Sequence, residues 1–507
     1  MPKLFLPLLL LPLLCTCVRA QTTYEATVRV AAAPDHPVSP LLYGQFIEHL
    51  GRCVDGGLYD PGSERSDARG FRTDVLDLVR PLDVPLLRFP GGTVTKIYHW
   101  KHGIGPKADR PKRPNLIWGG NIAYGFGTAE FITYCREIGA EPMLVVNMAT
   151  GTPEEASEWV EYCNGTGDTY WANLRRQHGY PEPFNVKYWG IGNEESAAPD
   201  AGRHWDADRY VYDTWQFAKL MKLQDPTVRL TIVGDTRDQA WNERVLDELH
   251  PITDNFAVHF YAVPNDTTYA SFLRSVYQYD AYLDTLRTQL AALPAEGGLT
   301  RWYRFPGRGE PVKLAVDEWG IWNMDSPKGR GTYRLEYPFH WGHALGTAAF
   351  LHMFHRNNDI IELATWAQTV NVLAPIMTSP DSAWTQTVYV PLREYRRRMM
   401  GRNVPVSVTA PDTDGAPSAL DVIASVSEDG RSLTVAAINL DPDRGARVRL
   451  DLADGWRPTG HATFGGKSVY GNRHTSQVLN VRGGADYYID GVNAPAASLT
   501  FWHYRRK

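Results

Sequence analysis

A strong excess of charge of either sign is absent from this chain of 507 residues. Lysine and arginine together number 52, and aspartate and glutamate 57, which leaves a net charge of −5. A balance this close supplies no broad field that would attract nucleic acid or an anionic membrane surface. We therefore expect no nucleic-acid partner and a neutral substrate.

The motifs of metal hydrolases and of phosphate-binding enzymes are missing as well. None of the 15 histidines stands in an HExxH or HxH pattern, and the spacing of His352 and His355 is typical of a helix that packs in a core. Gly125 and Gly127 are followed by neither a third glycine nor a lysine with Ser or Thr, so they indicate a turn ahead of a helix. We expect no metal and no cofactor.

Long apolar runs are confined to the N-terminus, where residues 4–14 follow Lys3. This run is too short for a stable membrane span and resembles a secretory signal peptide of residues 1–20, which predicts a secreted or periplasmic protein. A lipoprotein anchored through Cys15 or Cys17 is the weaker alternative, because the residues before each fit poorly. The cysteines left after cleavage are few and irregularly spaced, which implies no disulfide framework and leaves one pair open: Cys53, Cys135 and Cys163.

Aromatic residues, by contrast, are abundant. They make up 12% of the chain, and tryptophan alone occurs 16 times. Flat apolar rings suit the faces of sugar rings, so aromatic residues beyond those needed for a core favour a carbohydrate-active protein.

Residues 39–380 alternate short apolar runs with longer segments of helical period, as repeated βα units do. Helices are predicted at 128–138, where Gly139 follows as a stop, and at 344–354. Eight strands are the number that a closed (β/α)8 TIM barrel requires, and the predicted strands are 43–47, 84–89, 142–147, 186–192, 230–234, 256–260, 312–316 and 360–365.

The pattern changes near the C-terminus, which predicts a second domain at 381–507. Alternating stretches at 432–440, 446–452 and 498–504 are separated by turn residues, as in an antiparallel, jelly-roll-like β-sandwich. An N-terminal strand within residues 21–38 is expected to join this sandwich. No internal repeat or low-complexity tract is present.

Polar residues stand where the predicted strands end. The carboxyl ends of parallel barrel strands open on one face, so residues far apart in the sequence should meet there. Any one of them alone is more often a strand cap, but the whole set argues against coincidence. The set comprises Glu48, Arg88, Asn147, Asn193, Glu194, Asp235, His259, Tyr261, Glu318 and Gln368.

Glu194 and Glu318, after the fourth and seventh strands, predict a glycoside hydrolase. One carboxyl group can protonate a leaving oxygen while the other attacks or stabilises a cationic sugar. The acid then needs a raised pKa, and the nucleophile needs hydrogen bonds that keep it ionised. Asn193 and Tyr261 are placed to contact the sugar and Glu318, and Arg88 to balance charge. Two neighbours are less certain: Glu195 could be mistaken for the acid, and Asp317 is expected to point away.

Six motifs together resemble glycoside hydrolase family 51, the α-L-arabinofuranosidases, over nearly the whole mature chain: YGQFIEHLG, LRFPGG, FGTAEFITYCREIGAEPMLVVNMATGTPEEASEWVEYCNG, YWGIGNEE, LAVDEWGIWN and FHRNNDIIELATWAQTVNVLAPI. The resemblance implies a retaining double displacement without metal, with Glu194 as acid/base and Glu318 as nucleophile. It also implies that the enzyme releases terminal arabinofuranose from arabinan, arabinoxylan or arabino-oligosaccharides, and it allows a homo-oligomer. The residues expected to contact the sugar are Glu48, Arg88, Thr93, Asn193, His259, Tyr261, Trp322 and Gln368.

Three departures from the family pattern put the substrate in doubt. Thr93 stands where the family usually has Asn, residues 196–200 replace a Trp- or Gly-rich continuation, and the surroundings of Trp118 are unusual. Two alternatives remain open at this point: an endo-acting glucanase or xylanase on the same barrel, and a non-catalytic polysaccharide-binding protein.

Overall fold

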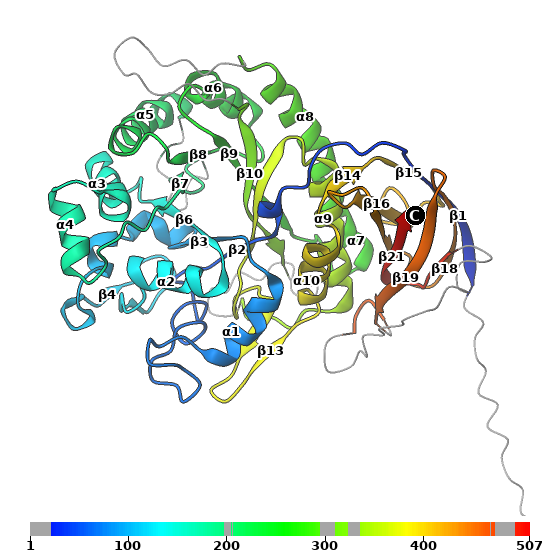
Figure 1. The fold of residues 1–507 in the computed structure, drawn as a ribbon, viewed down its shortest axis with the longest axis horizontal. Coiled ribbons are helices and arrows are strands. Elements are labelled where there is room, and N and C mark those ends of the chain that lie inside the picture. The colour runs from blue at the N-terminus through cyan, green and yellow to red at the C-terminus, as the bar shows by residue number, and fades with distance from the viewer. Residues whose placement is uncertain are drawn as a thin grey trace, which may run out of the picture.

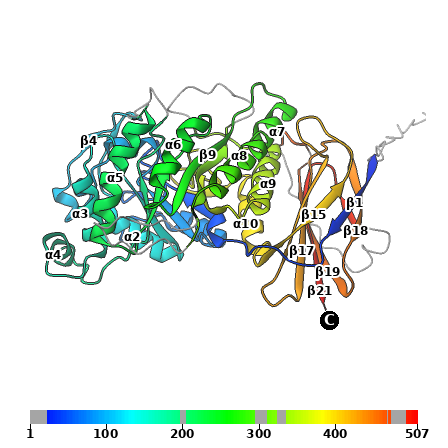
Figure 2. The ribbon, with the colours of Figure 1, turned by 90° about the horizontal axis from the view of Figure 1, so that it is seen from above.

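The computed structural model describes residues 22–196, 204, 206–294, 310–322, 335–466, 468–471 and 492–506. A barrel wrapped by helices and a pair of sheets lie side by side (Figures 1 and 2). The predicted signal peptide, residues 1–20, lies outside the described residues. Within the described part of the chain, no helix combines the length and apolar character needed to cross a membrane.

Eight parallel strands close the barrel, which confirms the predicted (β/α)8 fold. Each strand pairs with the next in chain order, and the last returns to the first. The strands are buried, which explains why they are apolar runs rather than alternating ones. They are β2 (Gly44–Phe46), β3 (Leu86–Phe89), β6 (Glu141–Val146), β7 (Tyr188–Ile191), β8 (Arg229–Val233), β9 (Asn255–Ala262), β10 (Lys313–Ile321) and β11 (Ile361–Ala367).

Helices surround the barrel (Figure 1). The second, α2, ends where predicted because Gly139 adopts a φ of 74°, a left-handed conformation that favours glycine. The described helices are α1 (Thr73–Val79), α2 (Thr128–Ile138), α3 (Pro153–Asn164), α4 (Tyr170–Gln177), α5 (Ala207–Gln224), α6 (Gln239–Leu249), α7 (Tyr269–Tyr277), α8 (Tyr279–Ala291), α9 (Trp341–Arg356) and α10 (Tyr389–Arg398).

Apolar side chains fill the barrel near the amino ends of its strands, and polar ones gather at the carboxyl ends. Leu86, Met143, Tyr188, Ala315 and Leu363 form one buried cluster inside. Short elements connect the rest: the 3₁₀ turns η1 (Pro40–Tyr43), η2 (Arg80–Leu82), η3 (Thr93–Ile97), η4 (Trp100–Gly103) and η5 (Lys107–Asp109), and the strand pairs β4 (Arg113–Pro114) with β5 (Asn121–Ile122) and β12 (Ile376–Thr378) with β13 (Ala383–Thr385).

The predicted β-sandwich is present, and the N-terminal strand β1 (Thr23–Val30) belongs to it, as expected. One strand pair departs from the predicted antiparallel arrangement: β1 runs parallel to β18. No hairpin joins these two strands, so nothing forces them to be antiparallel. One sheet has the order β15 (Val406–Thr409), β1, β18 (Gly445–Asp451), β20 (Val492–Ala494); the other has β14 (Arg402–Val404), β16 (Leu420–Val426), β17 (Ser432–Asn439), β21 (Ser498–Arg506), β19 (Trp456–Gly465).

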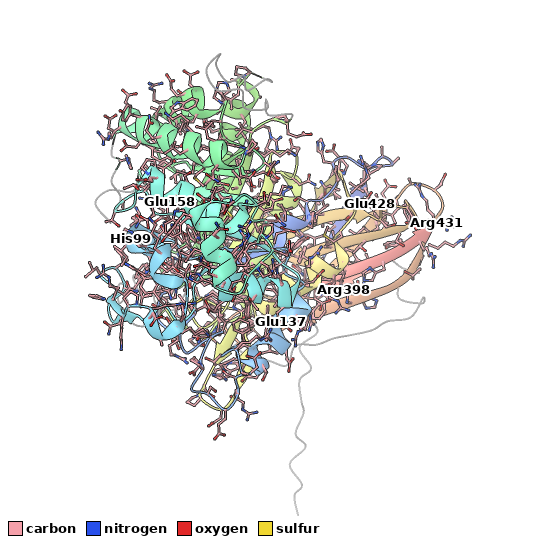
Figure 3. All side chains as sticks on the ribbon, turned by 60° about the vertical axis from the view of Figure 1, so that its left-hand side comes forward. His99, Glu137, Glu158, Arg398, Glu428 and Arg431 are labelled. Atoms are coloured by element: carbon pink, nitrogen blue, oxygen red, sulfur yellow. The ribbon has the colours of Figure 1, made fainter. Side chains whose placement is uncertain are left out.

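Helices α9 and α10 lie between the barrel and the sandwich (Figure 2). Arg398, at the end of α10, contacts His503 of β21 at 2.9 Å. Figure 3 shows Arg398 at this junction, with Glu428 and Arg431 at the far end of the sheets. The helix α10 precedes β14, the first sandwich strand that follows the barrel in the sequence, and the domain boundary at residue 381 stays a prediction.

Candidate active site

Glu194 and Glu318 meet at the carboxyl ends of the barrel strands. Glu194 follows β7, and Glu318 lies within β10, which continues beyond the predicted strand to Ile321. A carboxylate oxygen of each and a ring nitrogen of His259 all lie within 4.8 Å of one another. The fold therefore brings the two carboxylates together across more than a hundred residues.

Glu318 is held by two hydrogen-bond donors and lies close to Gly92. Arg88 donates from Nη1 to Oε1 at 2.8 Å, and the Tyr261 hydroxyl donates to Oε2 at 2.8 Å. Burial raises the pKa of Tyr261 well above its ordinary value, so its hydroxyl remains a donor. A Cβ atom on Gly92 would lie 2.4 Å from Oε1, so a larger residue at this position would displace the carboxylate. These contacts orient the Glu318 carboxylate and place the positive charge of Arg88 against it.

Asp317 does not point away from this cluster, contrary to the expectation from strand alternation. Its Oδ2 lies 3.3 Å from Nε of Arg88, and its Oδ1 lies 3.3 Å from Nε2 of His259. The register of β10 shifts against both neighbouring strands between residues 315 and 319. This irregularity interrupts the alternation and lets successive carboxylates face the same arginine.

Glu194 is hydrogen-bonded to His259, and each group changes the pKa of the other. Nδ1 of His259 lies 2.9 Å from Oε1 of Glu194 and 3.5 Å from Oε2 of Glu318. Burial lowers the pKa of His259, but the surrounding carboxylates, Glu318 first, outweigh burial and raise it to about 10. Burial likewise raises the pKa of Glu194, but the bonded, charged His259 holds it below its ordinary value. The raised pKa expected for the acid is therefore absent here, because the proton lies on the imidazole.

Glu195 is excluded as the acid by its surroundings. The side chain is fully buried, and its two oxygens are occupied by the Asn193 backbone N–H at 3.3 Å and by His204 Nδ1 at 2.9 Å. His204 in turn contacts Asp213 at 3.1 Å. Glu195 therefore supports the loop, while Glu194 faces the centre of the site with a side chain 36% exposed.

Glu48 is a further buried carboxylate of the site. Its Oε1 accepts from the backbone N–H of Val94 at 3.1 Å and from the Trp118 indole at 2.9 Å, and its Oε2 accepts from Gln368 at 2.7 Å. Burial, followed by the charge of Glu318, raises the pKa of Glu48 to about 7. Sequence reasoning noted Trp118 only as an aromatic of the family and did not assign it to Glu48.

Two buried amide atoms beside these carboxylates lack a hydrogen-bond partner among the described residues. They are Nδ2 of Asn193, whose Oδ1 accepts from Arg88 Nη2 at 2.6 Å, and Oε1 of Gln368. A buried donor and a buried acceptor left open in this way are available to a ligand that carries hydroxyl groups.

Comparisons with known proteins agree with this geometry. Residues 78–284 match the family model "Alpha-L-arabinofuranosidase 1 domain", and residues 317–479 match "Alpha-L-arabinofuranosidase C-terminal domain". The chain is 36% identical over 446 residues to a probable α-L-arabinofuranosidase C of Aspergillus niger, covering 82% of this chain and 85% of that protein.

A bacterial relative and a solved structure extend these matches. An intracellular exo-α-(1→5)-L-arabinofuranosidase of Streptomyces lividans is 33% identical over 79% of this chain and 62% of its own. The α-L-arabinofuranosidase of Thermotoga maritima, solved in complex with arabinose, superposes with a TM-score of 0.84 at 33% identity, covering 95% of this chain and 99% of that one.

The chain belongs to the α-L-arabinofuranosidases of glycoside hydrolase family 51. It is a glycosidase, and neither the endo-acting glucanase or xylanase nor the non-catalytic binder is favoured.

Trp322 and Thr93, the remaining residues expected to contact the sugar in this arabinofuranosidase, differ in the contacts that they make. Trp322 packs beside Tyr261, with ring centroids 6.5 Å apart at 73°. Thr93 is half-buried between Gly92, which touches Glu318, and Val94, which binds Glu48. No side-chain hydrogen bond of Thr93 occurs among the described residues.

Two polar residues at the strand ends of the arabinofuranosidase, Asn147 and Asp235, bind neighbouring backbone groups. Asn147 Oδ1 accepts from the backbone N–H groups of residues 149 and 150, and Asp235 Oδ1 accepts from those of residues 237 and 238. Both close turns, which is the ordinary role of such residues after a strand.

Lys96 is a site neighbour that sequence reasoning missed. It is buried in η3, and its ammonium group donates to the backbone carbonyl of Glu194 at 3.3 Å. The positive charge also contributes to the lowered pKa of Glu194. No strand-end signal could have indicated it, because it lies in a loop after β3.

Proposed function

We propose that this α-L-arabinofuranosidase is retaining and exo-acting, and that it releases terminal non-reducing arabinofuranosyl residues from arabinan, arabinoxylan or arabino-oligosaccharides. Glu318 is the nucleophile and Glu194 the acid/base. The observation that carries this proposal is the separation of the two carboxylates, with oxygens within 4.8 Å. Retaining enzymes hold their carboxyl groups about 5–5.5 Å apart, whereas inverting enzymes need about 6.5–9.5 Å to admit a water molecule.

In the first step, Glu318 attacks the anomeric carbon, and Glu194 protonates the departing glycosidic oxygen. Arg88 and Tyr261 orient the attacking carboxylate through their hydrogen bonds. The proton for the leaving group comes from the hydrogen bond between His259 Nδ1 and Glu194 Oε1, where transfer leaves a neutral imidazole and a protonated acid. In the second step, the ionised Glu194 takes a proton from a water molecule. The oxygen of this water attacks the anomeric carbon, which breaks the glycosyl–enzyme ester and frees Glu318.

The two open amide atoms support recognition of the arabinofuranose ring. Nδ2 of Asn193 can donate to a hydroxyl oxygen beside the reacting carbon, a contact that strengthens as positive charge develops on the sugar. Oε1 of Gln368 can accept from a second hydroxyl, while its amide nitrogen stays on Glu48. The named exo activity of the Streptomyces relative supports removal of terminal residues.

The first test replaces the nucleophile. Glu318→Ala should lower turnover by about 10⁴-fold or more, and azide should restore it by forming the arabinosyl azide of inverted configuration. The wild-type enzyme should release arabinose with retained configuration, as followed by NMR. An inverted first-formed anomer, or a variant that azide fails to rescue, would contradict the proposal.

Export is a separate proposal that rests on residues 1–20 alone. Cleavage after Ala20 predicts a mature chain that begins at Gln21. N-terminal sequencing of protein from the culture medium or periplasm checks this, and an unprocessed or lipidated N-terminus would overturn it.

A further inference from the structure

Lys96 is a buried cation next to Glu194 that neither step of the proposed reaction uses. The residue is 2% exposed and lies in η3, the segment that follows β3. Its ammonium group donates to the backbone carbonyl of Glu194 at 3.3 Å, and it has no ion pair within the described part of the chain. Burying an ammonium group without a carboxylate partner costs free energy, and departures of this kind are expected at functional sites.

The backbone of Glu194 explains why a donor is needed there. Its φ is 46°, a left-handed conformation that is uncommon for a residue with a side chain, and it follows Gly192, whose φ is 79°. This turn after β7 separates Glu194, which faces His259, from the fully buried Glu195. Such a conformation persists only where surrounding contacts hold it, and the hydrogen bond from Lys96 is one of these contacts.

The η3 segment is itself tied down at both ends, so Lys96 has a fixed support. At its start, the Thr95 hydroxyl donates to the backbone carbonyl of Gly92 at 2.6 Å, and Gly92 lies against the carboxylate of Glu318. At its end, the backbone carbonyl of Lys96 accepts from the Thr150 hydroxyl at 2.9 Å. The segment therefore connects the surroundings of the nucleophile with the backbone of the acid/base.

We propose that Lys96 is a positioning residue that holds the Glu194 backbone, so that this carboxyl group faces the glycosidic oxygen in the first step and water in the second. Because Lys96 is almost fully buried and bonds to the backbone, it acts through Glu194 and does not contact the substrate. Burial raises the pKa of Glu194, but His259 and then the charge of Lys96 lower it, which favours the ionised form that the second step needs. This inference rests on the proposed role of Glu194 as the acid/base.

Substrates that differ in leaving group test whether Lys96 acts through the acid/base. Lys96→Met keeps a side chain of similar length and removes both the charge and the donor. On α-1,5-arabinobiose, whose leaving group must be protonated, kcat/KM should fall by about 10- to 100-fold. An aryl arabinofuranoside with an activated leaving group departs without protonation, so its kcat/KM should stay within about twofold of the wild type.

The second step gives an independent measurement on the same aryl substrate. Its kcat should fall in Lys96→Met, because water attacks the glycosyl–enzyme with a misplaced base. Azide needs no base, so it should restore kcat and yield the arabinosyl azide of retained configuration. A role confined to folding would produce neither the dependence on leaving group nor the response to azide.

Three further variants serve as controls. Lys96→Arg keeps a charged donor and should retain the wild-type pattern more closely than Lys96→Gln, which removes the charge and should lose activity on arabinobiose as Lys96→Met does. Lys101→Met, at an exposed lysine of η4 that pairs with Glu158, should leave the kinetics on both substrates unchanged.

The outcomes separate this inference from the proposed function. Unchanged kinetics in the two neutral Lys96 variants, or a loss equal on both substrates, would overturn the positioning role. Glu194→Ala should show the same dependence on leaving group in a stronger form. If Glu194→Ala lacked it, the result would instead contradict the proposed acid/base and with it the proposed function.

Discussion

At the scale of single residues, the site is built around one imidazole that several carboxylates surround. Glu194, Glu318 and Asp317 surround one imidazole, His259, within hydrogen-bond or ion-pair distance. Titrations so coupled belong to the group and not to one residue. The raised pKa of His259 places a proton on this imidazole, between the carboxylates.

Glu48 does not contact His259, but burial and then the charge of Glu318 raise its pKa. Its pKa of about 7, against an ordinary 4.5, means that the folded enzyme binds more protons than the unfolded chain between these pH values. The contribution of Glu48 to the free energy of unfolding is then fully present below pH 4.5 and is lost as pH rises to about 7. The loss amounts to roughly 3 kcal/mol at most.

Glu48→Gln should remove this pH dependence. Relative to the variant, the wild type should lose thermal stability from pH 4.5 to 7 and change little above that, as measured by calorimetry across the range. Gln368 can rotate its amide so that its free oxygen accepts from the new side chain. Glu64→Gln, at an exposed position, is the control, and parallel curves for wild type and Glu48→Gln would contradict the assigned pKa.

At the scale of elements, alternation and periodicity account for most of what forms. In β1 the residues that face the sandwich core alternate with exposed ones, so Val28 is buried and Arg29 is not. The sequence pattern indicates such a strand, but its partners β15 and β18 begin almost 380 and 420 residues later. Pairing between them depends on tertiary contacts and not on local pattern.

Val28→Ser should destabilise the protein by roughly 2–4 kcal/mol, because it removes buried apolar volume and places a hydroxyl in the sandwich core. Arg29→Ser, the neighbour on the exposed face, should change stability by less than about 0.5 kcal/mol. Thermal or urea unfolding measures both. Equal effects at the two positions would show that β1 is not held by its core face.

At the scale of the whole molecule, the barrel and the sandwich are joined by a buried charge. Asp421 of β16 accepts from Arg356 and His352 of α9, at 2.7 and 2.9 Å, and from Tyr277 of α7 at 2.8 Å. Burial raises the pKa of Asp421, but Arg356 outweighs it and holds the pKa well below its ordinary value. Its stabilising contribution is therefore present above about pH 4 and lost at lower pH.

Asp421→Asn should lower the free energy of unfolding at pH 7 by roughly 1–3 kcal/mol; the half-exposed Arg356 keeps the loss below that of a fully buried pair. Its stability should also change less than that of the wild type as pH falls from 5 to 3. Thermal unfolding in that range gives both results. Kinetics on an aryl arabinofuranoside should be unchanged, and altered kinetics would mean that this interface acts on the site.

The sequence by itself determined the eight barrel strands, the sandwich with its N-terminal strand, and the meeting of Glu194 and Glu318. Apolar runs specify buried strands, and a parallel barrel must place all carboxyl ends on one face. Only the tertiary structure decided that Glu195 turns to His204, that Asp317 faces Arg88 and that His259 carries the proton. These outcomes depend on ångström distances between side chains of different elements, which no local period encodes.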